Sequence, residues 1–137
     1  MKRSALSSAA IEERLKQAGL QPTAQRIAIL RCVLCEAEHP TADDVKRWMD
    51  ENFPKVSLAT VYNTLGALVR VGVLKEIQLP HSGRTVYDDN VAHHYHFIDE
   101  RTGKVFDVDP GDVELKPKLG KGFQVRSVEV YLRGEKA

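Results

Sequence analysis

The hydrophobic pattern of this chain changes at Gly72, so we expect a different kind of secondary structure before and after this residue. Before Gly72, apolar residues recur at the spacing of an amphipathic helix. Thr23, Thr41 and Ser57 stand in front of three of these runs, and each can cap a helix N-terminus. The pattern therefore predicts helices over residues 8–18, 23–35, 41–53 and 57–71.

After Gly72 the sequence is typical of short strands. Residues 73–79 and 84–87 flank the turn residues 80–83, which predicts a β-hairpin, and further strands are predicted over 94–98, 104–108 and 124–132. We expect an α+β protein, with a winged helix-turn-helix for DNA binding in residues 1–83 and a small α/β dimerisation and metal-sensing domain in residues 84–137. The second part is too short to fold comfortably alone, so dimerisation and a bound metal are expected to stabilise it.

Composition narrows the class of protein. The hydrophobic fraction of 42% supports a packed core. No apolar run approaches the ~20 residues that a membrane span needs. The N-terminus lacks the apolar stretch of a signal peptide, so a cytoplasmic location is expected. The net charge is only +1, so any DNA-binding face must come from the local arrangement of its residues.

Two cysteines, Cys32 and Cys35, have the C-x-x-C spacing of a zinc knuckle or a redox pair. No second pair accompanies them, and they lie in an apolar helical run. Buried cysteine behaves as a small hydrophobic residue, so we expect both to lie in the core.

The predicted helix that begins at Ser57 carries short polar residues near its N-terminus, as a recognition helix needs to reach base edges. Asparagine can bond adenine, and threonine and tyrosine can contact thymine methyl groups. The candidate base contacts are Ser57, Thr60, Tyr62, Asn63 and Thr64, and the candidate phosphate contacts are Arg26 and Arg70. The alternative is an ordinary amphipathic helix whose polar side faces solvent.

Imidazoles and carboxylates gather in the segment that follows the predicted hairpin. In a strand His94 and His96 share one face, and Asp107 is expected on the neighbouring strand. With His39 and Asp88 they form a predicted five-ligand metal site of nitrogen and oxygen donors. Such a set without thiolate suits Fe(II), Mn(II) or Zn(II), and is more like an iron or manganese site than a structural zinc site. The alternative is that nearby aspartates satisfy these histidines.

His93 faces away from His94 and could join Asp89 in a second, weaker metal site, although a solvated side chain is the favoured interpretation. A metalloenzyme built on the same ligands is a competing function, since two histidines and a carboxylate also make an oxygenase site. The chain offers no general base beyond the ligands, so we expect no enzyme.

The chain resembles the ferric uptake regulator family over nearly its whole length. The resemblance lies in three motifs, namely Gly19 to Arg26, His39 to Val45 and Ala59 to Leu65. It implies a homodimeric repressor that binds an A·T-rich inverted repeat in double-stranded DNA when Fe(II) or Mn(II) is bound, with no membrane partner.

The branch of the family is indicated by single residues. Asp88 and Asn63 resemble the peroxide sensors of the PerR type, in which oxidation of the residues matching His39 and His94 relieves repression. Asp99 and Thr102 stand where most members carry zinc-binding cysteines, so no structural zinc is expected. That departure also resembles the haem-responsive Irr type, which is the alternative interpretation and would make haem the cofactor.

Overall fold

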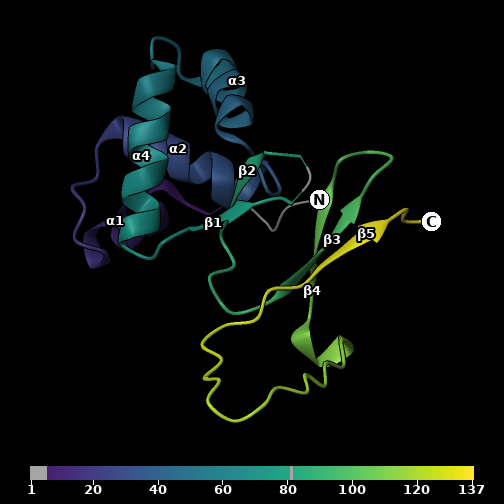
Figure 1. Ribbon diagram of the computed structural model, residues 1–137. Helices are drawn as coiled ribbons and strands as arrows, with labels where there is room; N and C mark the ends of the chain where they lie inside the picture. Colours follow the sequence, from purple (N-terminus) through teal and green to yellow (C-terminus); the bar gives the residue numbers. More distant parts are fainter. Residues whose placement is uncertain (1–5, 81) are drawn as a thin grey trace. The chain divides into compact units, whose positions relative to one another are not determined.

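The computed structural model describes residues 6–80 and 82–137 of the 137-residue chain. The chain forms two compact units, Met1–Val91 and Ala92–Ala137 (Figure 1). The assignment of residues 1–83 to DNA binding and 84–137 to dimerisation stays a prediction. Among the described residues, no helix is long and apolar enough to cross a membrane.

The first unit contains the helices that the sequence predicts. They are α1 (Ser8–Gln17), α2 (Ala24–Arg31), α3 (Ala42–Asn52) and α4 (Leu58–Arg70). The N-caps are Ser7, Thr23, Thr41 and Ser57, and each side chain accepts a hydrogen bond from a backbone N–H of the first turn. At α3 the Asp44 carboxylate also accepts from the Thr41 N–H at 3.0 Å, which completes the expected capping box. Each cap is worth about 1 kcal/mol, so local sequence sets where these helices begin.

The second predicted helix ends differently from the expectation. Its last part, Cys32–Glu36, is a π-helical turn, labelled η1, rather than a continuation of α2. Cys32 and Cys35 are both buried in the hydrophobic core, which confirms that they serve as core residues.

The core of the first unit forms where the four helices pack together. Its fully buried side chains come from every helix and from η1, and include Leu15, Leu30, Leu34, Met49, Leu65 and Leu68. Burial of each such side chain contributes about 1.5–3 kcal/mol. Because α4 supplies both Leu65 and Leu68, its buried face holds the opposite, polar face in place.

A β-hairpin follows α4, as the sequence predicts. Strand β1 (Lys75–Gln78) pairs antiparallel with β2 (Thr85–Asp88), and Lys75 lies opposite Asp88. The predicted turn between them includes residue 81, which lies outside the described residues. The Tyr87 N–H donates to the Pro40 carbonyl at 2.9 Å, so β2 is also tied to the loop before α3.

The second unit is a three-stranded sheet in the order β4-β3-β5 (Figure 1). Strand β3 (Tyr95–Asp99) pairs antiparallel with β4 (Val105–Val108) and parallel with β5 (Tyr131–Gly134). A short 3-10 turn, η2 (Pro110–Asp112), follows β4.

The prediction of a strand over residues 124–132 is wrong for most of that range. Residues 124–130 form neither helix nor strand, and regular structure resumes only at Tyr131. Apolar and polar residues alternate clearly only from Val128 onward, and β5 forms where the chain reaches the free edge of β3. The backbone groups of a strand need hydrogen-bond partners on a neighbouring strand. The apolar residues before Val128 therefore did not suffice to predict a strand there.

The turn between β3 and β4 depends on the buried carboxylate of Asp99. This carboxylate accepts a hydrogen bond from the Arg101 N–H at 3.0 Å. Burial is the largest single influence and raises the pKa of Asp99, but hydrogen bonds from Arg101 and Thr102, with the Arg101 charge, together hold that pKa below its ordinary value. The ionised carboxylate therefore stabilises the turn.

We expect Asp99→Asn to lower the free energy of unfolding at neutral pH. A depressed pKa contributes stability that is present above the unfolded value, 3.8, and is lost as the pH falls through the folded value. The difference between parent and variant should shrink below that pH, and urea unfolding of the metal-free proteins across a pH series measures it. Asp109→Asn, in the exposed cap of η2, is the control. A difference that persists unchanged at acid pH contradicts the argument.

Candidate metal centre and nucleic-acid face

The first unit holds two of the predicted metal ligands as a close pair. His39 Nε2 lies 3.2 Å from Asp88 Oδ2, and both side chains are nearly buried. Asp88, the last residue of β2, also accepts the Asn90 N–H at 2.9 Å. These two residues are called the His39–Asp88 pair below.

The backbone around this pair is held in an uncommon conformation. His39 has a φ of 46°, in the left-handed region, which costs a non-glycine residue about 1–2 kcal/mol. The hydrogen bond from Tyr87 to Pro40 joins the two neighbours of the pair, so the loop and β2 are fixed to each other. Strain that the surrounding structure maintains in this way is typical of functional sites.

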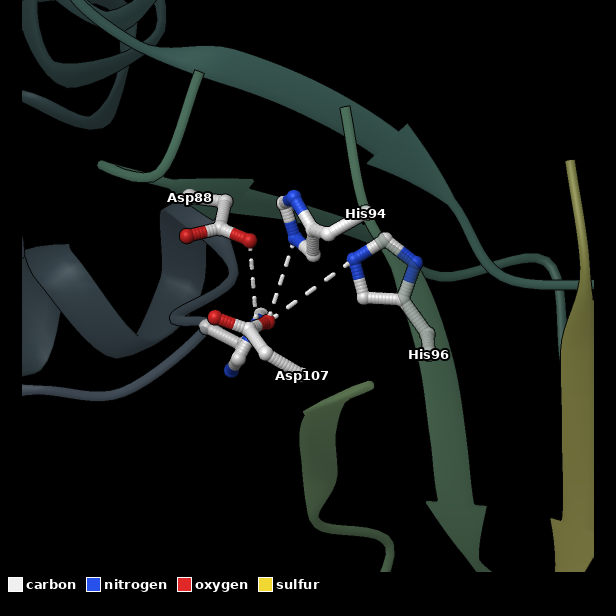
Figure 2. Close-up of side chains that lie close together, drawn as sticks. Asp88, His94, His96 and Asp107 are labelled. Carbon is white, nitrogen blue, oxygen red and sulfur yellow. Dashed lines mark ion pairs between the residues drawn. The ribbon is translucent and has the colours of Figure 1, made fainter. Parts of the chain in front are cut away.

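The second unit holds the other three predicted ligands. His94 precedes β3, His96 lies within it, and Asp107 is the direct cross-strand partner of His96 on β4. His94 Nε2 is 3.2 Å and His96 Nε2 is 4.0 Å from the same oxygen, Asp107 Oδ1 (Figure 2). One ligand atom from each residue lies within 4.8 Å of the others. These three residues are called the His94–His96–Asp107 cluster.

A backbone contact sets the tautomer of His94. Its Nδ1 lies 2.7 Å from the Ala92 carbonyl oxygen, which can only accept a hydrogen bond. Nδ1 therefore carries the proton, and in the neutral ring Nε2 presents a lone pair toward Asp107. A metal-binding histidine is commonly oriented by such a contact from its second ring nitrogen.

The cluster has the donor chemistry of a divalent metal site. Two buried imidazoles face one carboxylate oxygen, whereas a simple histidine–aspartate hydrogen bond needs only one imidazole. Asp107 is about 40% exposed, so an ion can approach from that side. Imidazole and carboxylate without thiolate fit Fe(II), Mn(II) or Zn(II).

Tyr131 is a neighbour of the cluster that the sequence did not indicate. Its ring stacks on that of His96, with centroids 5.7 Å apart and planes at 19°. Burial raises the pKa of Tyr131, and Glu129 raises it further. The only sequence signal was a tyrosine within a predicted strand, since which strand β5 would pair with is a tertiary matter.

The two residues of the predicted second metal site fall in different units. His93 is exposed, and its ring meets the Tyr95 ring edge-on at 5.3 Å. Asp89 is half-buried in the first unit. A site formed by these two residues stays a prediction.

The predicted recognition helix is α4, and the structure sorts its candidate residues by exposure. Tyr62, at 50%, and Asn63 are exposed, whereas Thr64 is buried and lies on the core side of the helix. Ser57 and Thr60 hydrogen-bond each other at the N-terminus, their hydroxyl oxygens 3.0 Å apart. The exposed face therefore centres on Tyr62 and Asn63.

The two arginines predicted to contact phosphate lie elsewhere in the first unit. Arg26 is half-buried in α2, and its guanidinium donates to the Gln21 carbonyl at 2.8 Å. Arg70 is exposed at the C-terminal end of α4. Their contact with phosphate stays a prediction.

Tyr62 also lines a cavity of about 670 Å³ together with Glu76, Arg84 and Tyr87. Burial raises the pKa of the Tyr87 phenol, and the nearby Glu76 and Tyr62 raise it further. Tyr87 therefore remains a protonated hydrogen-bond donor beside α4, the predicted recognition helix. The hairpin that supplies Asp88 also supplies this wall of the cavity, so both features depend on the position of β2.

Comparisons with known proteins agree with this arrangement. The sequence model of the ferric uptake regulator family matches residues 17–133, which include all of the predicted ligands. The peroxide-responsive repressor PerR of Staphylococcus aureus is 41% identical over 93 residues, which are 68% of this chain and 62% of that protein. The match thus spans less than two thirds of the relative's length.

Two solved structures extend the likeness over nearly the whole chain. PerR from Streptococcus pyogenes, described in a study of peroxide sensing and gene regulation, is 31% identical with a TM-score of 0.54, covering 99% of this chain and 95% of that one. The ferric uptake regulator of Pseudomonas aeruginosa, solved with manganese, is 26% identical with a TM-score of 0.68, covering 91% and 96%. The helical unit with its hairpin, the small sheet and the histidine–aspartate donors therefore have a common explanation, which is that this chain belongs to the ferric uptake regulator family.

Proposed function

We propose that this protein is a metal-dependent DNA-binding transcriptional repressor that senses peroxide through Fe(II), with Mn(II) as an alternative metal that does not respond. The observation that carries the proposal is the convergence of the His94 and His96 imidazoles on Asp107. The similarity to PerR proteins of two species supports the peroxide signal. The protein acts in the cytoplasm on DNA and is not an enzyme.

The proposed regulatory site is the five-ligand set that the sequence predicts, in which the His39–Asp88 pair and the His94–His96–Asp107 cluster supply the donors for one divalent ion. Each set contains imidazole and carboxylate, the donors that Fe(II) and Mn(II) accept. Any higher affinity of the metal for the DNA-competent shape shifts the population toward that shape.

The chain's own residues would prepare this site for peroxide. Bound Fe(II) supplies an electron that peroxide can take. The Ala92 carbonyl holds His94 in the tautomer that presents Nε2, and Tyr87 holds the loop that carries His39. Oxidation of His39 or His94 removes a ligand, so the metal is released and repression ends.

The DNA-binding face is the exposed side of α4, with Tyr62 and Asn63 at its centre and Ser57 and Thr60 at its N-terminus. Arg26 and Arg70 contact phosphates, and Thr64 supports the helix from the core. A homodimer presents two such helices about 34 Å apart, which matches successive major-groove turns of an A·T-rich inverted repeat.

Exposed apolar residues in the second unit support the homodimer. The irregular segment between η2 and β5 leaves Leu115, Leu119, Phe123 and Val125 between 46% and 68% exposed. Large apolar side chains left exposed along one short segment are a feature that an interface with a partner would explain. A second copy of this chain would cover them.

The donor set favours a metal cation over haem. His94 and His96 are both directed at a carboxylate, which attracts a compact cation. No contact among the described residues favours the haem-responsive alternative.

Removal of one ligand should uncouple DNA binding from metal. We expect His96→Ala to weaken Mn(II) binding by more than the ~10–100-fold that is lost when a residue that only orients a ligand is removed, because a direct ligand is lost. Calorimetric Mn(II) titration and operator binding with and without Mn(II) measure the effect. His93→Ala, at the exposed neighbour, is the control. A His96→Ala protein whose DNA binding still depends on Mn(II) would show that the site is assigned to the wrong residues.

The recognition face can be tested separately. We expect Asn63→Ala to weaken operator binding by about 5–150-fold, since a good side-chain contact to a base is worth about 1–3 kcal/mol, and to leave Mn(II) affinity unchanged. The DNA is an operator selected by the Mn(II)-loaded protein from random sequence. Asn52→Ala, at the exposed end of α3, is the matched control. Equal losses in the two variants would argue against this face.

The peroxide signal has its own test. We expect one equivalent of peroxide to abolish operator binding by the Fe(II) protein and to leave the Mn(II) protein bound. The peptide that holds His39 or His94 should gain one oxygen atom in the Fe(II) sample alone, as read by mass spectrometry. Retained DNA binding with no change of mass in the Fe(II) sample would refute peroxide sensing.

A further inference from the structure

The parallel pairing of β3 and β5 sets Tyr131 against the metal cluster. Tyr131 lies directly across from His96 in the register, and the His96 N–H donates to the Val130 carbonyl at 3.2 Å. These backbone contacts place Tyr131 beside His96, and its phenol ring stacks on the imidazole with centroids 5.7 Å apart. The sheet therefore sets which residue of β5 neighbours the ligand His96.

Only one imidazole ring separates this phenol from the centre of the cluster. Nε2 of His96 faces Asp107. The centroids of the His94 and His96 rings lie 4.5 Å apart. Tyr131 is half-buried and its ring contacts a predicted ligand, so it lies within reach of a small reactive species formed at the cluster.

The other tyrosines of the chain can be compared with Tyr131. Tyr95 lies on β3 beside His96, but successive strand residues point to opposite faces, and its ring contacts His93 instead. Tyr62 and Tyr87 belong to the first unit. Tyr131 is thus the tyrosine with a ring contact to a cluster ligand.

We propose that Tyr131 is a further oxidation site of the peroxide response, where its ring is hydroxylated next to the phenol oxygen. This inference rests on the proposed function. Its consequence is competition. Each oxidising equivalent that Tyr131 consumes is one that His94 does not receive, so Tyr131 raises the amount of peroxide needed to end repression.

The chemistry balances with peroxide and iron as the only co-reactants. Iron(II) held by His94, His96 and Asp107 would supply the one electron that breaks the O–O bond of peroxide into hydroxide and a hydroxyl radical. The radical would add to a ring carbon of Tyr131. The adduct would then lose one electron, which the oxidised metal takes back, and one proton, which hydroxide takes to give water. In sum, a ring C–H and peroxide become a ring C–OH and water, with peroxide reduced and the ring oxidised by two electrons.

The first experiment maps oxidation in the full-length protein. Fe(II)- and Mn(II)-loaded samples receive one equivalent of peroxide without oxygen, and digested peptides are sequenced by tandem mass spectrometry. We expect Tyr131 to gain one oxygen atom in the Fe(II) sample only and several-fold more often than Tyr95. This measurement uses the unaltered chain and does not depend on whether a variant folds.

The second experiment tests competition with Tyr131→Leu, and Tyr95→Leu is the matched control. We expect Tyr131→Leu to keep its Mn(II) affinity, to oxidise more His94 per equivalent of peroxide and to lose operator binding at a lower peroxide dose. Tyr95→Leu should resemble the parent in the peroxide dose.

The outcomes separate this inference from the proposed function. Oxidised His39 or His94 with unmodified Tyr131, and an unchanged dose in Tyr131→Leu, would overturn the inference and leave peroxide sensing intact. Equal oxidation of Tyr131 and Tyr95 would mean diffuse radical damage and would also overturn it. No oxidised peptide in the Fe(II) sample would overturn peroxide sensing, and the inference with it.

Discussion

The antiparallel register between β3 and β4 is the constraint on which the candidate metal centre depends. It puts Asp107 directly across from His96, and the alternation of strand side chains brings His94 to the same carboxylate. A slip of one residue would turn Asp107 to the other face of the sheet and dissolve the cluster. The same central strand receives β5 on its other edge, so one strand organises both the ligands and the tyrosine beside them.

In the first unit, helix caps and core packing fix the positions of the candidate residues. Its helices begin at side-chain caps, and its core of leucines fixes α4 with the polar face outward. The hydrogen bond between Tyr87 and Pro40 then links the hairpin to the strained loop at His39. Strand β2 therefore carries Asp88 of the candidate metal centre and Tyr87, which lines one cavity with Tyr62 of α4.

Much of this arrangement could be predicted, and the failures have clear reasons. Caps at Thr23, Thr41 and Ser57 are local signals and were correct. The hairpin and the first two strands of the sheet followed from alternation and turn residues. The predicted strand over 124–132 was mostly wrong because an edge strand forms only where a partner offers backbone groups, which begins at Tyr131. Burial of Thr64 was missed because the residue was assigned by its polarity, although it lies at helical spacing from Val61 and Leu68 on the buried side of α4.

The sequence by itself determined the types of donor, the helix starts and the motifs that place this chain in the ferric uptake regulator family. These features depend on residue identity and on spacings of a few positions, so they can be predicted from short stretches of sequence. Tertiary structure alone decided that Ala92 sets the tautomer of His94, that two imidazoles share one oxygen of Asp107, and that Tyr131 stacks on His96. Those contacts join residues whose distance in space follows from strand register and packing, and register is a property of the assembled sheet rather than of any single segment.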